Sequence, residues 1–374
     1  MKHLISVCLG LSGLLLSCGG ATSVGNPPSP PSDRFAYVSN INSSTVTAYK
    51  VNSSTGALTP IGGSPFGGVA SPTGLAISPN SELLAAGNTG GPGVSVFRLD
   101  KTTGSIAPVA GSPFLTSGGG YPIRTVFHTS GKFLYSAMIP CSSSNVWAFS
   151  VASSGALTPV PGSPFAGQTL VGLGGVNSIA LHPSGKYLYS SGPFMGITAY
   201  LIDATSGALS QLPGSPFIPA GAFFNSVLAV HPSGNFLYMA DFDADGVRVF
   251  PIADNGSVGT EIAGSPFASG VGPRDLALDP SGKFVFVPNE GDLNVTSFTT
   301  DAGTGALTLV GNADTGNGPS AVAVDSSGKF LYVTNYWDEK VSAYEVDSTS
   351  GALALVTGSP FAAQDGAISV VTTK

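Results

Sequence analysis

The chain is poor in charged side chains and in cysteine, and both shortages narrow the classes it can belong to. Asp, Glu, Lys and Arg make up only 9% of 374 residues, and the formal net charge is −7. The few Lys and Arg residues form no cluster, so we expect no nucleic-acid partner. If Cys8 and Cys18 belong to an export signal, Cys141 has no partner for an internal disulfide. Packing must then stabilise the fold.

Sustained helical periodicity is also missing beyond the first residues, whereas turn residues are abundant. The chain has 51 Gly and 29 Pro, and 42% of it is hydrophobic. That apolar content is too high for a disordered chain. Gly and Pro interrupt helices and mark turns, so the composition favours short β-strands joined by tight turns.

The N-terminus is typical of an exported lipoprotein. Lys2 and His3 precede an apolar run, 4–16, that is too short to span a membrane, and we interpret 1–17 as a signal peptide. The run ends in LLSC, which looks like a bacterial lipobox with Cys18 as the lipidated residue. Residues 18–33 are small, polar and Pro-rich, as in a tether. We expect an exported protein of the cell envelope, held to a bacterial membrane only by a lipid on Cys18; an ordinary signal peptide is the alternative.

Three landmarks recur along the rest of the chain. The tetrapeptide GSPF starts at positions 63, 111, 162, 214, 264 and 358, and GNAD (311–314) stands near the middle of the one long gap. Seven runs resembling PSGKFLYVTN start near positions 31, 79, 129, 183, 232, 280 and 326. Seven short turns resembling TSGAL start at positions 54, 102, 153, 205, 254, 303 and 349. The chain therefore contains seven repeats of about fifty residues.

Each repeat can be divided into four short strands. In the fifth unit these are expected at 226–231, 236–240, 247–252 and 258–263, with an Asp-Gly hairpin turn before the third. Isolated sheets of this apolarity would expose both faces, whereas radial packing of seven sheets buries them. We predict an all-β, seven-bladed β-propeller of four-stranded antiparallel blades over 34–374, and we expect the protein to be a monomer.

The ring must also be closed. The propeller begins at 35–39 with a strand of the second type, and no inner strand precedes it. Residues 367–372 match an inner strand such as 74–78. We therefore predict that the C-terminal strand completes the first blade.

FLYVTN (330–335) and FAYVSN (35–40) resemble the YVTN-type propeller repeat. With the PSGK and GAL landmarks, residues 33–374 are similar to the seven-bladed lactonase family, which includes 6-phosphogluconolactonase-like enzymes. The resemblance implies a lactone hydrolase that needs no metal or other cofactor.

Comparison of the repeats separates structural from functional candidates. His128, His182 and His231 occupy one repeat position, which Asp279 and Asp325 fill in the next units, so we interpret all five as turn residues. Arg124 and Arg274 stand at the starts of inner strands, where other units carry Asn177, Asn225 and Ser320. Arg in an apolar channel is usually paired or binds an anion. We therefore take Arg124, Asn177 and Asn225 as candidate substrate-binding residues.

The segment 272–295, GPRDLALDPSGKFVFVPNEGDLNV, is similar to the family's GPRH…P-G-K…VxNE segment. The resemblance makes Arg274 and Glu290 the candidate catalytic residues, with Arg274 stabilising an oxyanion or carboxylate and Glu290 acting as general base. Asp275 and Asn289 join the candidate substrate-binding set. Asp275 stands where the family has one His, and Asn225 where it has another. The alternative is that Arg274 and Glu290 form a structural ion pair across the channel.

Two alternatives stay open. Asp241, Asp243 and Asp245 match the start of a calcium loop, but position twelve is Ile252 and no helices flank it, so a tight hairpin explains them more simply. The whole protein could also be a non-catalytic propeller that binds a glycan or a protein at the cell surface. The partners expected are thus a small-molecule lactone or a glycan.

Overall fold

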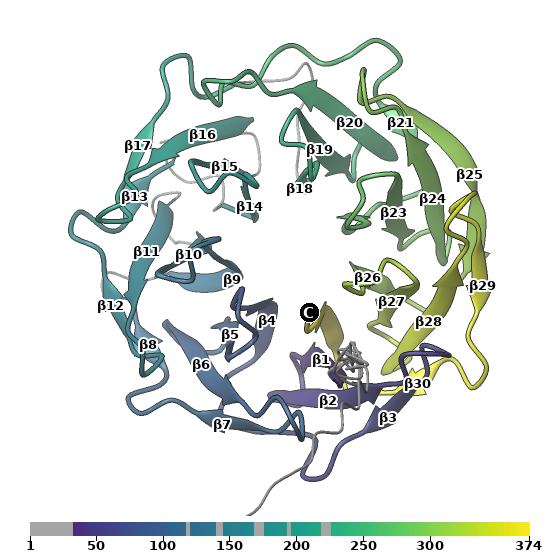
Figure 1. The fold of residues 1–374 in the computed structure, drawn as a ribbon, viewed down its shortest axis with the longest axis horizontal. Coiled ribbons are helices and arrows are strands. Elements are labelled where there is room, and N and C mark those ends of the chain that lie inside the picture. Colours follow the sequence, from purple (N-terminus) through teal and green to yellow (C-terminus); the bar gives the residue numbers. More distant parts are fainter. Residues whose placement is uncertain (1–32, 117–119, 140–144, 168–175, 193–195, 218–225) are drawn as a thin grey trace, which may run out of the picture. The chain divides into compact units, whose positions relative to one another are not determined.

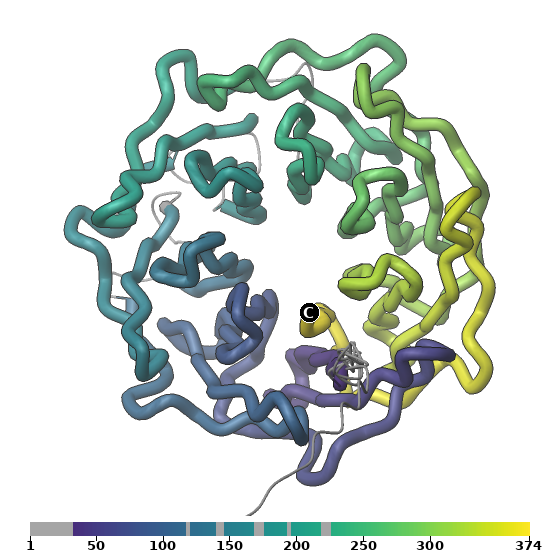
Figure 2. The backbone as a smooth tube through the Cα atoms, in the orientation of Figure 1, coloured from purple at the N-terminus to yellow at the C-terminus, as the bar shows by residue number. Residues whose placement is uncertain are grey.

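Seven antiparallel sheets are arranged as blades around a central axis in the computed structural model, which describes residues 33–116, 120–139, 145–167, 176–192, 196–217 and 226–374. Figure 1 shows the inner strand of each blade facing the axis and the later strands following outward. The tube in Figure 2 shows the same chain path, with the C-terminus on the inner side of the ring beside the start of the propeller. In the described part of the chain no helix is long and apolar enough to cross a bilayer. The predicted all-β, seven-bladed fold is confirmed.

The first four blades follow the chain from its first described residues. Blade 1 consists of β1 (Arg34–Asn40), β2 (Thr45–Val51), β3 (Leu58–Pro60) and β31 (Ala367–Thr372). Blade 2 consists of β4 (Pro72–Ile77), β5 (Leu83–Asn88), β6 (Gly93–Leu99), β7 (Ile106–Pro108) and β8 (Phe114–Leu115). Blade 3 consists of β9 (Tyr121–Phe127), β10 (Phe133–Ile139), β11 (Asn145–Val151), β12 (Leu157–Pro159) and β13 (Phe165–Ala166). Blade 4 consists of β14 (Ser178–Leu181), β15 (Tyr187–Ser191), β16 (Ile197–Ile202) and β17 (Leu209–Gln211).

The remaining three blades repeat the pattern. Blade 5 consists of β18 (Ser226–Val230), β19 (Phe236–Asp241), β20 (Gly246–Pro251) and β21 (Phe267–Ala268). Blade 6 consists of β22 (Ala277–Leu278), β23 (Phe284–Asn289), β24 (Asn294–Thr300) and β25 (Leu307–Asp314). Blade 7 consists of β26 (Pro319–Val324), β27 (Phe330–Asn335), β28 (Lys340–Val346), β29 (Leu353–Leu355) and β30 (Phe361–Ala362).

The ring closes between the two ends of the propeller. β31 pairs antiparallel with β1, with Val370 opposite Val38, and becomes the inner strand of blade 1. Two further bonds support this join: the amide of Phe35 donates to the Thr373 hydroxyl, and Arg34 forms an ion pair with Asp325 of blade 7. The prediction that the C-terminal strand completes the first blade is confirmed.

The core lies between blades. Within the described residues, the buried apolar side chains form seven clusters, and each cluster joins one pair of neighbouring blades. Strands such as β5 and β27 are buried on both faces, which is why their sequences are apolar throughout and do not alternate. Because each blade packs only on its two neighbours, stability depends on every interface in the ring.

Tyrosines of the FLYVTN-like runs link five of the seven blades to the next. The hydroxyl of Tyr135 in β10 donates to the carbonyl of Gly207 in the GAL turn of blade 4, at 3.1 Å. The same bond is made by Tyr37, Tyr189, Tyr238 and Tyr332 to their next blades. Burial raises the pKa of all five hydroxyls, so they remain donors at neutral pH. In these blades the FLYVTN-like run and the GAL turn, two of the three landmarks, are therefore the two sides of one contact between neighbouring blades.

GSPF forms the second half of a divided outer strand. In each of its six copies the Ser hydroxyl accepts a hydrogen bond from an amide of the third strand, as Ser163 does from Ala148 at 2.8 Å. The Ser-Pro peptide bond is cis in all six. The Phe then pairs with the same strand, as Phe165 does with Val146. In blade 6, where GNAD replaces GSPF, β25 runs undivided along β24 for eight residues.

The prediction of a regular outer strand at 258–263 in blade 5 is therefore wrong. Val258 makes only an isolated bridge to Ile252, and the amide of Ile262 donates to Val249. The position beside β20 is taken by β21, which begins at the Phe of GSPF. A divided outer strand lies at the periphery of the blade, where the apolar pattern that marks buried strands is weak.

Phe165→Ala is expected to lower the free energy of unfolding by about 2 kcal/mol, because half-buried Phe165 packs into the cluster between blades 3 and 4. Thermal and urea unfolding measure this change. Leu115→Ala is the matched control, since Leu115 follows the same Phe in blade 2 but is 66% exposed. Equal effects of the two substitutions would contradict the inference that Phe165 stabilises the interface between blades 3 and 4.

The three histidines are structural, as interpreted from the repeats. Nε2 of His128 donates to the carbonyl of Gly185 in the next blade, and Nδ1 accepts from the amide of Ser130. His182 and His231 repeat both bonds. Asp279 and Asp325 accept from the amides of the same turn instead. The five side chains thus fix the turn after the inner strand, away from the cavity described next.

Candidate functional site

A cavity of about 520 Å³ opens at one end of the axis. Its wall is built from inner-strand starts of all seven blades and from loops between the second and third strands of blades 6 and 7. This volume lies in the usual range for sites of small ligands. The residues that line it are Thr73, Gly74, Ile123, Arg124, Ile139, Asn177, Ser226, Val227, Pro273, Arg274, Glu290, Ser320, Ala321, Tyr336, Trp337, Ile368 and Ser369.

Strand register shows which of these positions are equivalent. Arg124 lies opposite Ala137, two residues before Val126, which pairs with Tyr135. Counting from the matching pair Ala277–Phe286 in blade 6, the equivalent of Arg124 is Asp275. Arg274 lies one residue earlier, at the level of Asn177, Ser226 and Ser320. Our sequence comparison, which equated Arg124 with Arg274 and Asn177 with Asn225, is therefore wrong by one residue in blades 3 and 5.

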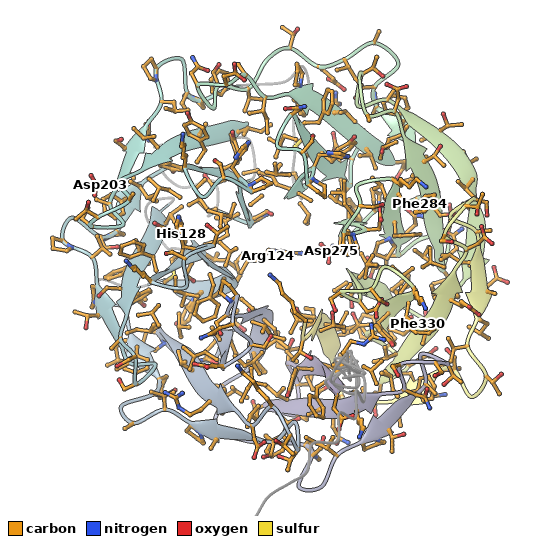
Figure 3. All side chains as sticks on the ribbon, viewed as in Figure 1. Arg124, His128, Asp203, Asp275, Phe284 and Phe330 are labelled. Carbon is orange, nitrogen blue, oxygen red and sulfur yellow. The ribbon has the colours of Figure 1, made fainter. Side chains whose placement is uncertain are left out.

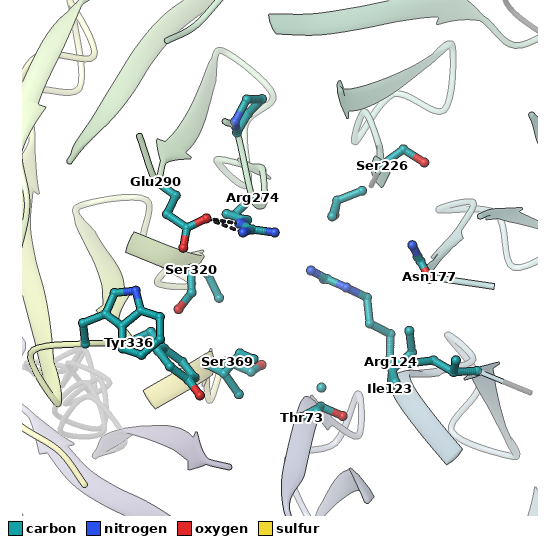
Figure 4. Close-up of a pocket in the computed structure, with 17 residues that line it drawn as sticks. Thr73, Ile123, Arg124, Asn177, Ser226, Arg274, Glu290, Ser320, Tyr336 and Ser369 are labelled. Atoms are coloured by element: carbon teal, nitrogen blue, oxygen red, sulfur yellow. Dashed lines mark hydrogen bonds and ion pairs between the residues drawn. The ribbon is translucent and has the colours of Figure 1, made fainter. Parts of the chain in front are cut away.

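Arg274 and Glu290 meet on the wall of the cavity. Nε of Arg274 donates to Oε2 of Glu290 at 2.5 Å, and a second guanidinium nitrogen bonds the same oxygen (Figure 4). Both side chains are about one-third exposed. The guanidinium also lies 4.6 Å from the ring centre of Phe242. Among the described residues none donates to Oε1 of Glu290, so this oxygen is open to the cavity.

Backbone bonds hold this pair in place. The amide of Arg274 donates to the carbonyl of Pro288, and the amide of Glu290 donates to the carbonyl of Gly272. The two residues therefore stand on adjacent chain segments of one blade, and the ion pair lies along the wall. A different ion pair crosses the channel.

The ion pair that crosses the channel is formed by Arg124 and Asp275. They come from blades 3 and 6, and their guanidinium and carboxylate meet at 3.2 Å near the axis (Figure 3). Asp275 is buried, and its other oxygen accepts from the amide of Val322 in blade 7. Arg124 is one-third exposed and lines the cavity. Asp275, which we placed among the substrate-binding residues, thus holds Arg124 and is not one of the residues that line the cavity.

The other candidates are distributed differently. Asn177 lines the cavity. Asn289 is fully buried, and its Nδ2 donates to the carbonyl of Ser269 and to the Thr296 hydroxyl. The same amide-to-hydroxyl bond recurs in blades 1, 2 and 7, which indicates a turn residue of the repeat. Asn225 and Cys18 lie outside the described residues, and their roles stay predictions.

Sequence reasoning left out several residues of the wall. Tyr336 and Trp337 were not among the predicted site residues, although Trp337 is 63% exposed and the two rings meet edge-to-face with 4.6 Å between their centres. Thr73 and Ser369 contribute hydroxyl-bearing side chains, whereas Ser226 lines the wall but is buried. Counting back a constant number of residues from His128, and from the equivalent turn residue of each other blade, would have found the wall position that Arg274 and Asn177 share.

The acidic loop of blade 5 forms a hairpin. Oδ1 of Asp241 accepts from the amides of Asp243 and Ala244, and Oδ2 accepts from Arg248. Asp245 has a positive φ of 52° and accepts from the amide of Gly272. The carboxylates of Asp241 and Asp245 thus hold the loop and its neighbour in place. In the described part of the chain no three His, Cys, Asp or Glu residues are grouped to hold a metal ion.

The arrangement can serve ester chemistry. A guanidinium beside a carboxylate with one open oxygen places an oxyanion donor next to a proton acceptor. Hydroxyl and amide side chains around them can bind a polyhydroxylated ligand. The mouth adds an aromatic surface.

Known proteins resemble this chain in sequence and in fold. Residues 29–119 and 226–365 match the family model described as lactonase, 7-bladed beta-propeller. A 6-phosphogluconolactonase of Pectobacterium carotovorum subsp. carotovorum is 27% identical over 146 residues, which cover 37% of this chain and 43% of that protein. The aligned part is therefore less than half the length of that curated relative.

Solved structures match over the whole ring. A structure from Bacteroides fragilis covers 93% of this chain and 100% of its own, with a TM-score of 0.75 and 21% identity. The periplasmic gluconolactonase of Pseudomonas aeruginosa covers 92% of this chain and 99% of its own, with a TM-score of 0.67 and 20% identity. At these identities the likeness is one of fold. With the family model matching more than half of its residues, the chain belongs to the seven-bladed β-propeller lactonase family.

Proposed function

We propose that this protein is an exported lactonase, anchored to the cell envelope through Cys18, that hydrolyses a sugar lactone or a similar anionic lactone in the axial cavity. The observation that carries the proposal is the Arg274–Glu290 pair on the cavity wall, with Oε1 of Glu290 open. The names of its relatives, 6-phosphogluconolactonase and periplasmic gluconolactonase, support the reaction class and its occurrence outside the cytoplasm.

The reaction needs a base and an oxyanion site. Oε1 of Glu290 accepts a proton from a water molecule, whose oxygen attacks the lactone carbonyl carbon. The carbonyl oxygen becomes an oxyanion, which Arg274 stabilises by donating from a guanidinium nitrogen. The ring C–O bond then breaks, the departing oxygen takes the proton from Glu290, and the product is a hydroxy acid. Atoms and charge balance without any further group.

Glu290→Gln and Arg274→Ala are each expected to lower kcat/KM for lactone hydrolysis by about 100-fold or more, the size of effect seen when one oxyanion donor or general base is removed. Glucono-δ-lactone is a suitable first substrate, followed by release of acid with a pH indicator. Lys50→Ala is the control, because it breaks an exposed ion pair, with Asp33, on the outer part of blade 1. No hydrolysis by the unaltered protein, or full activity in both variants, would overturn the assignment.

A second function is favoured by one observation, the exposed Trp337 beside the cavity mouth. Exposed aromatic rings at a cavity are typical of carbohydrate and other ligand sites, and a propeller without activity could bind a glycan there. Glycan binding that is lost in Trp337→Ala, in a protein that hydrolyses no lactone, would support this function over the first.

A further inference from the structure

We infer that the cavity selects an uncharged sugar lactone over a phosphorylated one; this rests on the proposed lactonase function and narrows its substrate class. The family resemblance led us to expect Arg124 and Arg274 as an anion site. The structure instead places a carboxylate against each of them.

Both cationic groups of the cavity are already neutralised. Arg274 is bonded to Glu290 and Arg124 to Asp275, so two positive and two negative charges cancel. Among the described residues, no other Lys or Arg lines the cavity. The internal segments that the structure leaves undescribed contain none either, since 117–119, 140–144, 168–175, 193–195 and 218–225 carry no charged residue in the sequence. A phosphate entering this cavity would compete with carboxylates for both guanidinium groups.

The loops beside the mouth add negative charge. Blade 6 carries Asp292 two residues after Glu290. Blade 7 carries Asp338 and Glu339 after Trp337, followed by Lys340, so these loop residues together add negative charge. Asp292 and Asp338 are held toward the neighbouring backbone, where they accept from the amides of Val271 and Asn317. These two carboxylates are therefore fixed within two residues of Glu290 and Trp337, which line the cavity. A phosphate with almost two negative charges is repelled by such a rim, whereas a neutral ring is not.

The mouth offers a neutral ring a preformed surface. Tyr336 and Trp337 are fixed by backbone bonds from their amides to Gly318 and Asn317. A Cβ added to Gly318 would stand 2.3 Å from Cδ1 of Trp337, so the indole lies directly on the backbone of this glycine. A rigid, exposed indole can pack against the C–H face of a pyranose ring at little entropic cost. Hydroxyls of Thr73, Ser320 and Ser369 also lie on the wall. Each makes one or more bonds to the backbone and keeps a further donor or acceptor position for the ring's hydroxyl groups.

The first test compares two substrates that differ only in the phosphate. Glucono-δ-lactone is expected to give a kcat/KM at least about tenfold higher than its 6-phosphate, a ratio set by repulsion of the phosphate. Trp337→Ala is expected to raise KM about tenfold and leave kcat nearly unchanged, with Trp337→Phe restoring much of the loss. Equal or better use of the 6-phosphate would overturn the inference while leaving the lactonase function intact.

The second test measures binding without turnover. Glucose and glucose 6-phosphate are titrated against the full-length protein while the fluorescence of Trp337 is followed; Trp147, the other Trp, is buried. Glucose is expected to bind more tightly than its phosphate. Asp275→Asn should release Arg124 and strengthen glucose 6-phosphate binding about tenfold, since one neutralising charge is removed.

Asp203→Asn is the matched control for Asp275→Asn, because it makes the same change of charge in an exposed turn at the outer edge of blade 4 (Figure 3). Binding of glucose 6-phosphate as tight as glucose, binding of neither sugar, or equal effects of the two substitutions would each overturn the inference. These results do not depend on hydrolysis, so failure of the lactonase function is recognised separately by the absence of turnover.

Discussion

Ending the chain at Gly366, which removes β31, is expected to abolish cooperative unfolding. β31 supplies the inner strand of blade 1, and its side chains Ala367 and Val370 belong to the cluster between blades 7 and 1. Val371 packs on the cluster between blades 1 and 2. Both interfaces of blade 1 therefore lose buried surface, and the ring opens where its ends meet. Because net stabilities are only about 5–15 kcal/mol, this loss is comparable with the whole stability of the ring.

Scanning calorimetry and circular dichroism measure this outcome. Deletion of Lys374 alone is the control, since this residue is exposed and follows the strand. A second variant places residues 363–374 before Asp33 through a flexible linker, which restores the strand by another connection. A truncated protein that unfolds cooperatively within a few degrees of the intact one would contradict closure by β31.

Gly207→Ala is expected to destabilise the fold by about 3 kcal/mol. Gly207 has a φ of +75°, a conformation that costs an L-residue roughly 1–2 kcal/mol. A Cβ there would stand 2.4 Å from Cδ1 of Phe133 in the neighbouring blade, and such overpacking adds roughly 1–3 kcal/mol. The Gly207 carbonyl also accepts from Tyr135, so displacement of the turn weakens a buried hydrogen bond. Urea unfolding measures the change.

Gly62→Ala is the matched control for this substitution. A Cβ at Gly62 would meet no atom within 4 Å, and this residue lies in an exposed turn of blade 1. We expect a change within about 0.5 kcal/mol, as for other exposed surface positions. Similar losses at both glycines would mean that the contact between Gly207 and Phe133 does not limit stability.

The fold was accessible from the sequence because its energetics repeat. Each interface between blades uses the same pieces: a strand buried on both faces, a large apolar side chain, and a glycine of the next blade's GAL-type turn. That side chain is an aromatic ring such as Phe133 in six interfaces and Leu83 between blades 2 and 3. Six or seven copies make each landmark visible within the one sequence. The outer strand was misplaced in blade 5, because that strand is divided and makes few apolar contacts.

The candidate site was accessible only in part. Arg274 and Glu290 are adjacent because their segments pair within one blade, and a local segment can reveal that. Arg124 and Asp275 are 151 positions apart and meet because blades 3 and 6 face each other across the axis. A one-residue error in register had concealed that these two residues occupy the same level.

The sequence by itself determined that the chain folds into seven repeated blades and that the C-terminal strand closes the ring, since these features depend on local patterns of apolar and turn residues. The tertiary structure decided the electrostatics of the cavity. Whether an arginine is available to an anion depends on which carboxylate stands opposite it, and ring geometry, together with strand register, sets that distance. For this reason the same two arginines that suggested an anion site belong, in the folded protein, to a cavity whose charges are balanced.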